Sequence, residues 1–178
     1  MLPKIFYGVV VFTSCMTCIT SSMISLEGKS FNITKSLPVA PGKILLAKIL
    51  TSDIITIPAI LICDVIFFVV FKVAIIDIVL ILLASIIMPT FTAILGILIN
   101  LKYPKMDAIS DTEVVKQSMS SMISVFIGMF IGMLSVAAVI IGGNLFIILE
   151  LLVFSIIVCI LWNILKRYGV RRFKEINF

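Results

Sequence analysis

The sequence predicts an all-α, polytopic transmembrane helix bundle that forms a single domain over residues 1–178. Hydrophobic residues make up 62% of the chain, charged residues make up only 13%, and the mean hydropathy is +1.32. Soluble domains carry about 25% charged residues, so this composition predicts a chain that lies in a lipid bilayer. A helix needs about 20 apolar residues to cross a bilayer, and the chain offers five apolar lengths of that order.

We predict five crossings, over residues 5–24, 54–71, 75–100, 119–141 and 145–165. The apolar run from 54 to 100 would be about 70 Å long as one helix, more than twice a roughly 30 Å hydrocarbon core. It is therefore predicted to cross twice, with a turn near Lys72. The sequence Gly142-Gly143-Asn144 is a turn signal and is predicted to join the last two helices.

The basic residues predict the orientation of the chain in the membrane. Two loops, 25–53 and 101–118, and the tail 166–178 hold twelve of the fourteen Lys and Arg residues. The other side keeps only Lys4 and Lys72. Because Lys and Arg are enriched on the cytoplasmic side, we expect a multi-pass protein of the cell membrane with cytoplasmic loops and a cytoplasmic C-terminus. A topological role for these charges also argues against nucleic-acid binding.

No catalytic or cofactor chemistry is expected in this chain. Gly28-Lys29-Ser30 matches the tail of a phosphate-binding loop, but Met23 stands where the first glycine of that loop is required. Cys15 and Cys18 have the spacing of a zinc or redox pair, yet the chain has no histidine and no second cysteine pair. The absence of histidine also argues against an intramembrane hydrolase. We predict no enzyme, metal or cofactor.

The loop 25–53 is the most informative polar stretch of the sequence. Pro38 and Pro41 favour extended backbone in the residues before them, and Pro41 suits the first turn of a helix. From Lys43 onward the alternation of apolar and basic residues predicts a short amphipathic helix on the membrane surface, leading into the next crossing. This loop is predicted to have structure of its own.

The order E-G-K-x-F-x-x-x-K-x-L-P-V-x-P-x-K-I-L-L-A-K, from Glu27 to Lys48, resembles the cytoplasmic loop of permease subunits of ABC-2 type exporters. The stretches 101–107 and 113–118 resemble the matching second loop of a Gram-positive subgroup of that family. The resemblance implies that loop 25–53 couples a separate ABC ATPase subunit to transport, with nucleotide chemistry on that partner. The residues implied in coupling are Glu27, Gly28, Lys29, Lys35, Leu37, Pro38 and Lys48.

The resemblance also raises a question about the number of helices. Membrane units of ABC-2 type usually have six helices with both ends cytoplasmic, whereas five are predicted here. The expected partners therefore include the bilayer, the ATPase, and a second permease chain or a missing N-terminal part. The alternative function is a non-transporting membrane protein, either an immunity or regulatory partner or the inactive remnant of a larger permease.

Asp64 lies near the middle of the second predicted crossing. A central Asp costs about 2.5 to 3.5 kcal/mol on insertion, so it should face the bundle interior and find a partner or water. Thr56 on the same helix, and Ser14, Cys18 and Ser22 of the first helix, are candidate partners. Two roles stay open for Asp64: a place along the translocation path, and a structural hydrogen bond.

Four small residues recur at every fourth position of the fourth predicted helix: Ser120, Ser124, Gly128 and Gly132. Small residues allow helix backbones to approach closely in lipid, where packing replaces the hydrophobic drive. The stripe therefore predicts a close helix contact, either within the chain or between two copies.

Overall fold

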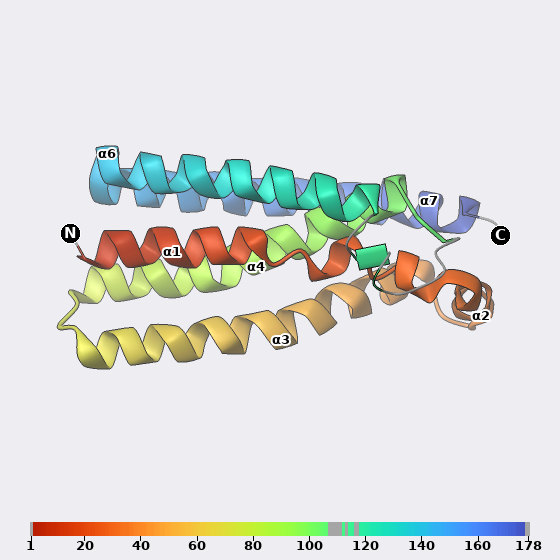
Figure 1. Cartoon of the computed structure of the whole chain (residues 1–178), viewed down its shortest axis with the longest axis horizontal. Coiled ribbons are helices and arrows are strands. Elements are labelled where there is room, and N and C mark those ends of the chain that lie inside the picture. Colours follow the sequence, from red (N-terminus) through yellow and green to blue (C-terminus); the bar gives the residue numbers. More distant parts are fainter. Residues whose placement is uncertain (1, 107–111, 113, 116–117, 177–178) are drawn as a thin grey trace.

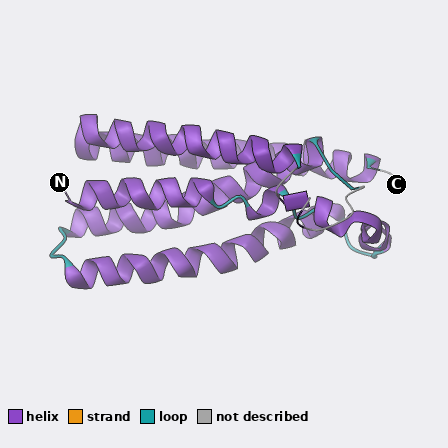
Figure 2. Cartoon of the chain, in the orientation of Figure 1, coloured by secondary structure: helices purple, strands orange, loops and turns teal. Residues whose placement is uncertain are grey.

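The computed structural model describes residues 2–106, 112, 114–115 and 118–176, and of Lys29 only the backbone. These residues form helices joined by short loops, and none of them lies in a strand (Figure 2). The predicted all-α transmembrane bundle is confirmed. Within the described residues, four helical segments are long and apolar enough to cross a membrane: Leu2–Gly28, Pro41–Val70, Ile75–Lys102 and Met119–Glu175.

The last of these segments crosses twice. Helix α6 (Met119–Ile164) has 46 residues, about 69 Å of helix, which is more than twice the thickness of a hydrocarbon core. Its backbone leaves the helical conformation at Gly143, where φ is 66° and ψ is −151°. The chain reverses there and runs back along the bundle (Figure 1). We call the two parts the first arm (119–142) and the second arm (144–164); the predicted turn lies between them.

The first helix is shorter than predicted. Helix α1 (Leu2–Met16) ends well before residue 24, and the chain continues through two 3-10 turns, η1 (Ile19–Ser21) and η2 (Ser25–Ser30). The hydroxyls of Thr13, Ser14 and Thr17 hydrogen-bond to carbonyl oxygens three or four residues earlier. Such side-chain bonds compete with the helical pattern and are frequent where helices bend or end. The apolar run predicted the crossing, but not its interruption.

The second crossing begins earlier than predicted. Helix α3 (Pro41–Val70) is continuous over 30 residues, so the expected separate surface helix is instead the first turns of the membrane helix. Pro41 occupies the first turn, where a missing N–H costs nothing, and nothing between it and residue 54 breaks the helix. The turn to α4 (Ile75–Lys102) falls at residues 71–74, next to the predicted boundary.

The bundle has two ends of different character (Figure 1). One end, here the loop end, carries η2, α2 (Phe31–Ser36), the π-helical turn η3 (Leu165–Gly169) and α7 (Val170–Glu175). The opposite end, here the turn end, carries the N-terminus, the 71–74 turn and the reversal at Gly143. The first long loop, the described residues of the second and the described part of the tail thus lie at one end.

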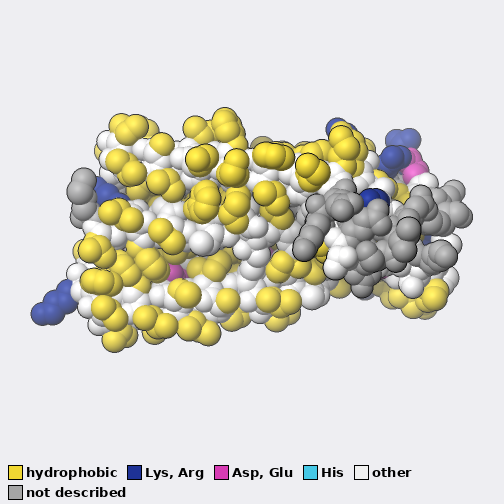
Figure 3. Space-filling model, in the orientation of Figure 1, with side chains coloured by type: hydrophobic (Ala, Val, Ile, Leu, Met, Phe, Trp, Pro, Cys, Tyr) yellow, Lys and Arg dark blue, Asp and Glu magenta, His cyan; other side chains and the backbone are white. Residues whose placement is uncertain are grey.

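Two apolar clusters form the core, one toward each end. Tyr7, Val11, Ile81 and Met88 belong to the cluster that joins α1, α3, α4 and both arms of α6. The second cluster, at the loop end, is built from Ile24, Phe31, Leu45, Ile49, Ala93, Ile94, Ile97, Leu101, Met106, Leu165, Phe173 and Ile176. It packs the loop 25–53 against α4 and the tail. Outside these clusters the sides of the bundle are covered with exposed apolar side chains, as expected for a lipid-facing surface (Figure 3).

Candidate functional site: the loop end and the broken first helix

The loop 25–53 is held to α3 by an ion pair. The Lys48 ammonium lies 2.5 Å from Glu27 Oε1, and it also donates a hydrogen bond to the Met23 carbonyl oxygen at 3.2 Å. Both charged side chains are largely buried, with 14% of Lys48 and 21% of Glu27 exposed. Lys48 therefore connects α3 to the segment that follows α1. The structure brings these two sequence-predicted residues into direct contact.

Gly28 allows the chain to turn between the two parts of η2. Its φ is 46° and its ψ is −124°, a conformation in which L-residues with a side chain are strained. Among the described residues, a Cβ at this position would meet the Met106 carbonyl oxygen at an ordinary 3.6 Å, so it is the backbone conformation that favours glycine here. The Lys29 side chain lies outside the described residues, as do Asp107, Glu113 and Lys116 of the second loop.

Lys35 binds the tail of the same chain. Its ammonium donates hydrogen bonds to the carbonyl oxygens of Lys174 (2.7 Å) and Ile176 (3.0 Å). One helical turn earlier, the Phe31 ring packs edge-on against Phe173, with 5.0 Å between ring centroids. Helix α2 is therefore docked on α7, a partnership that the sequence did not predict.

The tail itself is ordered by local ion pairs. Arg171 Nε donates to Glu175 Oε1 at 2.9 Å, and Arg172 lies 3.4 Å from the other carboxylate oxygen. The hydrogen bond from Arg171, helped by Arg172, holds the pKa of the exposed Glu175 carboxyl below its ordinary value. Such exposed pairs contribute little stability, so the tail depends mainly on the packing of Phe173.

Beyond α2 the chain forms an exposed elbow, which we define as residues 36–40. All five side chains are exposed, including 49% of Leu37 and 43% of Val39. Pro38 lies at the centre of the elbow, and the first turn of α3 directly follows the elbow. Leu37 and Pro38 are thus the two predicted coupling residues that this end of the molecule presents outward.

A fully buried asparagine joins the loop to the bundle. Asn100 Oδ1 accepts hydrogen bonds from the backbone N–H groups of Ile24 (2.8 Å) and Ser25 (3.2 Å). Its Nδ2 donates to the hydroxyls of Ser25 (2.8 Å) and Ser120 (3.0 Å). One side chain on α4 therefore binds the segment after α1 and the start of α6. The signal in the sequence was an amide at the end of an apolar run, which the sequence analysis did not single out.

The interruption of α1 is enclosed by two glycines on neighbouring helices. A Cβ at Gly96 of α4 would lie 2.3 Å from Thr20 Oγ1, and a Cβ at Gly128 of α6 would lie 2.1 Å from the Cys15 carbonyl oxygen. Non-helical backbone at membrane depth is tolerated only where protein or a water-filled cavity surrounds it. The two glycines provide the close protein contact that satisfies this condition.

A cavity of about 460 Å³ lies beside the interruption. Its lining comes from the broken segment, from the start of α6 and from Val115, which precedes α6: Cys18, Ile19, Ser21, Ser22, Met23, Leu26, Val115, Ser121 and Val125. The wall is mainly apolar, with several hydroxyl groups. Many transporters have a broken helix beside a cavity of this kind.

Asp64 is fully buried and pairs with α4. Its Oδ2 accepts a hydrogen bond from the Ser85 hydroxyl at 2.6 Å, while Oδ1 has no partner among the described residues. The partners expected from the sequence bond elsewhere: Thr56 donates to the Ser52 carbonyl, and Ser14 donates to the Val10 carbonyl. Asp64 faces the interior as predicted, but its neighbour is Ser85, which the sequence analysis did not consider.

The stripe of small residues lies against α1. Ser120, Ser124, Gly128 and Gly132 are all buried. A Cβ at Gly132 would lie 2.8 Å from the Phe12 ring, and the Cβ at Gly128 would overlap the α1 backbone. Of the two arrangements that the sequence left open, this is a contact within the chain.

Residues 2–168 match the model of a family described as a membrane protein of 12 transmembrane segments. The chain belongs to this family. No curated protein and no solved structure matches the chain.

Membership of this twelve-span family agrees with the apolar helices in showing a multi-span membrane protein. The family description states no activity, so function has to be argued from the site. The chain has an exposed elbow that leads into the continuous helix α3, and the Glu27–Lys48 ion pair joins α3 to the segment after the broken α1, beside the cavity. Such an arrangement can transmit a displacement from the loop end to the cavity wall.

Proposed function

We propose that this chain is a membrane permease component of an ATP-driven exporter of ABC-2 type, and that the loop 25–53 couples a partner ATPase to substrate translocation. The observation that carries the proposal is the Glu27–Lys48 ion pair behind the exposed elbow. The sequence resemblance implies that this loop is the coupling element, and the ion pair supports this by joining the loop to the membrane helix α3.

The elbow is suited to receive a displacement because it leads directly into α3. Pro58 lies in the interior of helix α3, so a partner that presses on residues 36–40 would shift the part of α3 that precedes Pro58, including Lys48. Lys48, two turns into α3, would carry this shift to Glu27 and to the Met23 carbonyl. Met23 also lines the cavity beside the broken α1, so the shift would displace part of the cavity wall.

Transport in this proposal requires no chemistry from the chain itself. ATP is bound and hydrolysed by the partner, and the chain alternates the exposure of a path between its helices. Asp64 is a candidate for that path because one of its carboxylate oxygens is buried without a partner among the described residues. The cavity at residues 18–26 would form the part of the path nearest the loop end.

The proposal is tested by uncoupling. In a reconstituted complex with the ATPase that copurifies with the chain, Glu27→Ala should lower transport-linked ATP hydrolysis while membrane insertion and ATPase binding stay intact. Lys102→Gln removes an exposed charge at the same end, outside the ion pair, and should leave coupling unchanged. Normal coupling in Glu27→Ala would contradict the proposal, and absence of any ATPase partner would favour the alternative of a non-transporting membrane protein.

A further inference from the structure

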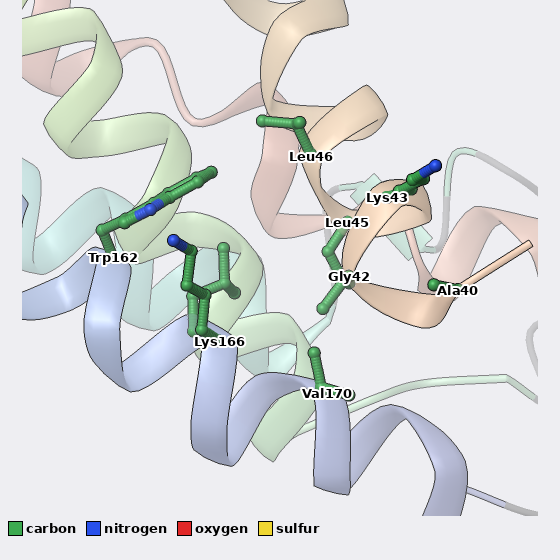
Figure 4. A pocket seen from close by; sticks show the side chains of 9 residues that line it. Ala40, Gly42, Lys43, Leu45, Leu46, Trp162, Lys166 and Val170 are labelled. Carbon is green, nitrogen blue, oxygen red and sulfur yellow. The ribbon is translucent and has the colours of Figure 1, made fainter.

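A second cavity lies at the loop end, on the side where α3 begins and the second arm of α6 ends (Figure 4). Its volume is about 270 Å³, and its lining comes from Ala40, Gly42, Lys43, Leu45, Leu46, Trp162, Leu165, Lys166 and Val170. The wall is almost entirely apolar, while the charged groups are two lysines. None of these lining residues takes part in the Glu27–Lys48 or Asn100 contacts.

The Lys166 ammonium is the cationic group of this cavity, and the Trp162 ring fixes its position. The Lys166 ammonium lies 5.2 Å from the centroid of the Trp162 ring, over its face, and points into the gap between α6 and α3 (Figure 4). Lys166 lies on the π-helical turn η3. The Lys43 ammonium points away from this gap on the other side of the first turn of α3, where its exposed side chain adds positive charge nearby.

The position of the cavity decides which anion suits it. It lies where the apolar crossings end and the basic loops begin, and Trp is enriched at this membrane–water boundary. Basic pockets between membrane helices on this side of a bilayer bind anionic head groups. One turn along the same face of α3, Leu46 is followed by Leu50, which is 47% exposed and continues the apolar surface toward the bilayer.

We propose that this cavity is a binding site for an anionic phospholipid. The lipid phosphate would accept a hydrogen bond from Lys166, and the upper part of the lipid would occupy the apolar wall between Leu46 and Trp162. The volume is below the range of about 300–1,000 Å³ that is typical for whole small-molecule ligands, so only part of the lipid enters. Its acyl chains lie outside, along the exposed apolar faces of α3 and α6.

Trp162 makes the proposal directly measurable because it is the single tryptophan of the chain. The purified protein is reconstituted into phosphatidylcholine bilayers that contain increasing fractions of brominated phosphatidylglycerol or, separately, brominated phosphatidylcholine. Bromine quenches tryptophan fluorescence on contact. We expect the anionic lipid to quench at about five-fold lower mole fraction, the preference that one lysine near an anionic headgroup supplies.

Three variants distinguish lipid binding in this cavity from general attraction by positive surface charge. Lys166→Gln should abolish the preference for phosphatidylglycerol. Lys102→Gln removes an equal charge that lies over the Tyr103 ring at the same end, outside the cavity, and should keep the preference. Gly42→Leu retains every charge and places its side chain in the cavity, so it should also lose the preference. A Cβ at Gly42 makes an ordinary 3.5 Å contact with Val170, and the unfolding midpoint of the variant in detergent checks that the longer side chain leaves the fold intact.

Several results would overturn the proposal. Equal quenching by the two brominated lipids in the unmodified chain would show that no anionic lipid is selected. Equal losses in Lys166→Gln and Lys102→Gln, or a preference that survives in Gly42→Leu, would assign the effect to diffuse charge. If inorganic phosphate at matched ionic strength removes the preference, the site binds a soluble anion and not a lipid.

Discussion

At the scale of single residues, the polar groups inside this membrane protein act as connectors. Asn100 makes four hydrogen bonds to three residues in two other segments of the chain while it is fully buried. In a low-dielectric interior a network of this kind is stabilising only when every member is satisfied. Asn100 is therefore the residue whose loss should most disturb the segment that follows α1.

We predict that Asn100→Leu lowers the stability of the folded bundle by about 2–4 kcal/mol, because two backbone N–H groups lose their acceptor. The measurement is the thermal unfolding midpoint of the purified protein in a mild detergent. Asn163→Leu is the matched control: its side chain is exposed and donates only to the Cys159 carbonyl, so the midpoint should change little. Similar midpoints for the two variants would remove the connector role of Asn100.

The Glu27–Lys48 ion pair allows a second prediction at this scale. The pair is neither fully buried nor fully exposed. Removal of one partner should therefore lower the free energy of unfolding by about 2 kcal/mol, between the values typical of surface and of buried ion pairs. The combined change of Glu27→Gln and Lys48→Gln should cost clearly less than the sum of the single changes. Additive effects on unfolding would show that the two side chains do not stabilise each other.

At the scale of elements, the packing of α1 on α6 depends on the absence of a side chain at Gly128. A Cβ there would lie 2.1 Å from a backbone oxygen of α1, which cannot move without shifting the helix. We predict that Gly128→Ala alone lowers stability by about 1–3 kcal/mol, the usual cost of overpacking.

Gly42→Ala is the control for this prediction, since its Cβ meets Val170 at an ordinary 3.5 Å. Comparison of the two unfolding midpoints in detergent gives the result. The double change Gly128→Leu and Gly132→Leu should prevent assembly of the bundle altogether. A Gly128→Ala protein as stable as Gly42→Ala would mean that α1 does not pack on this stripe.

Helix number and the reversal at Gly143 were predictable because apolar length and glycine turns are local properties of the sequence. The end of α1 was not predictable, because it depends on hydroxyl groups that bond back to the helix and on glycines of α4 and α6, which are far away in the sequence. The same applies to the partners of Asp64 and Lys35. Asp64 was recognisable as a buried acid, but only tertiary packing selects Ser85 as its partner.

At the scale of the whole molecule, the distribution of basic residues and the arrangement of the helices indicate the same orientation in the membrane. The first loop, the described residues of the second loop and the described part of the tail lie at the loop end, and positive charge is retained on the cytoplasmic side of membranes. We predict that a cysteine at Ser36, in the elbow, reacts with a membrane-impermeant thiol reagent only after cells are permeabilised. A cysteine at Lys72, in the opposite turn, should react in intact cells.

Both variants require a background without reactive native thiols. Cys63 and Cys159 are exposed on the apolar surface, and the half-buried Cys18 lines the cavity beside the broken α1, so these three would be replaced by serine; Cys15 is buried. Labelling of Ser36→Cys in intact cells, or protection of Lys72→Cys until permeabilisation, would reverse the proposed orientation and place the elbow out of reach of any cytoplasmic ATPase.

The most direct test of the central claim is crosslinking from the elbow in native membranes. A photo-crosslinker attached at Ser36→Cys, followed by purification of the tagged chain and mass spectrometry, identifies what contacts residues 36–40. The account predicts capture of an ABC ATPase at Ser36→Cys and none at Lys72→Cys. If the chain is intact and inserted and no ATPase is captured from the elbow, the coupling role of loop 25–53 is contradicted.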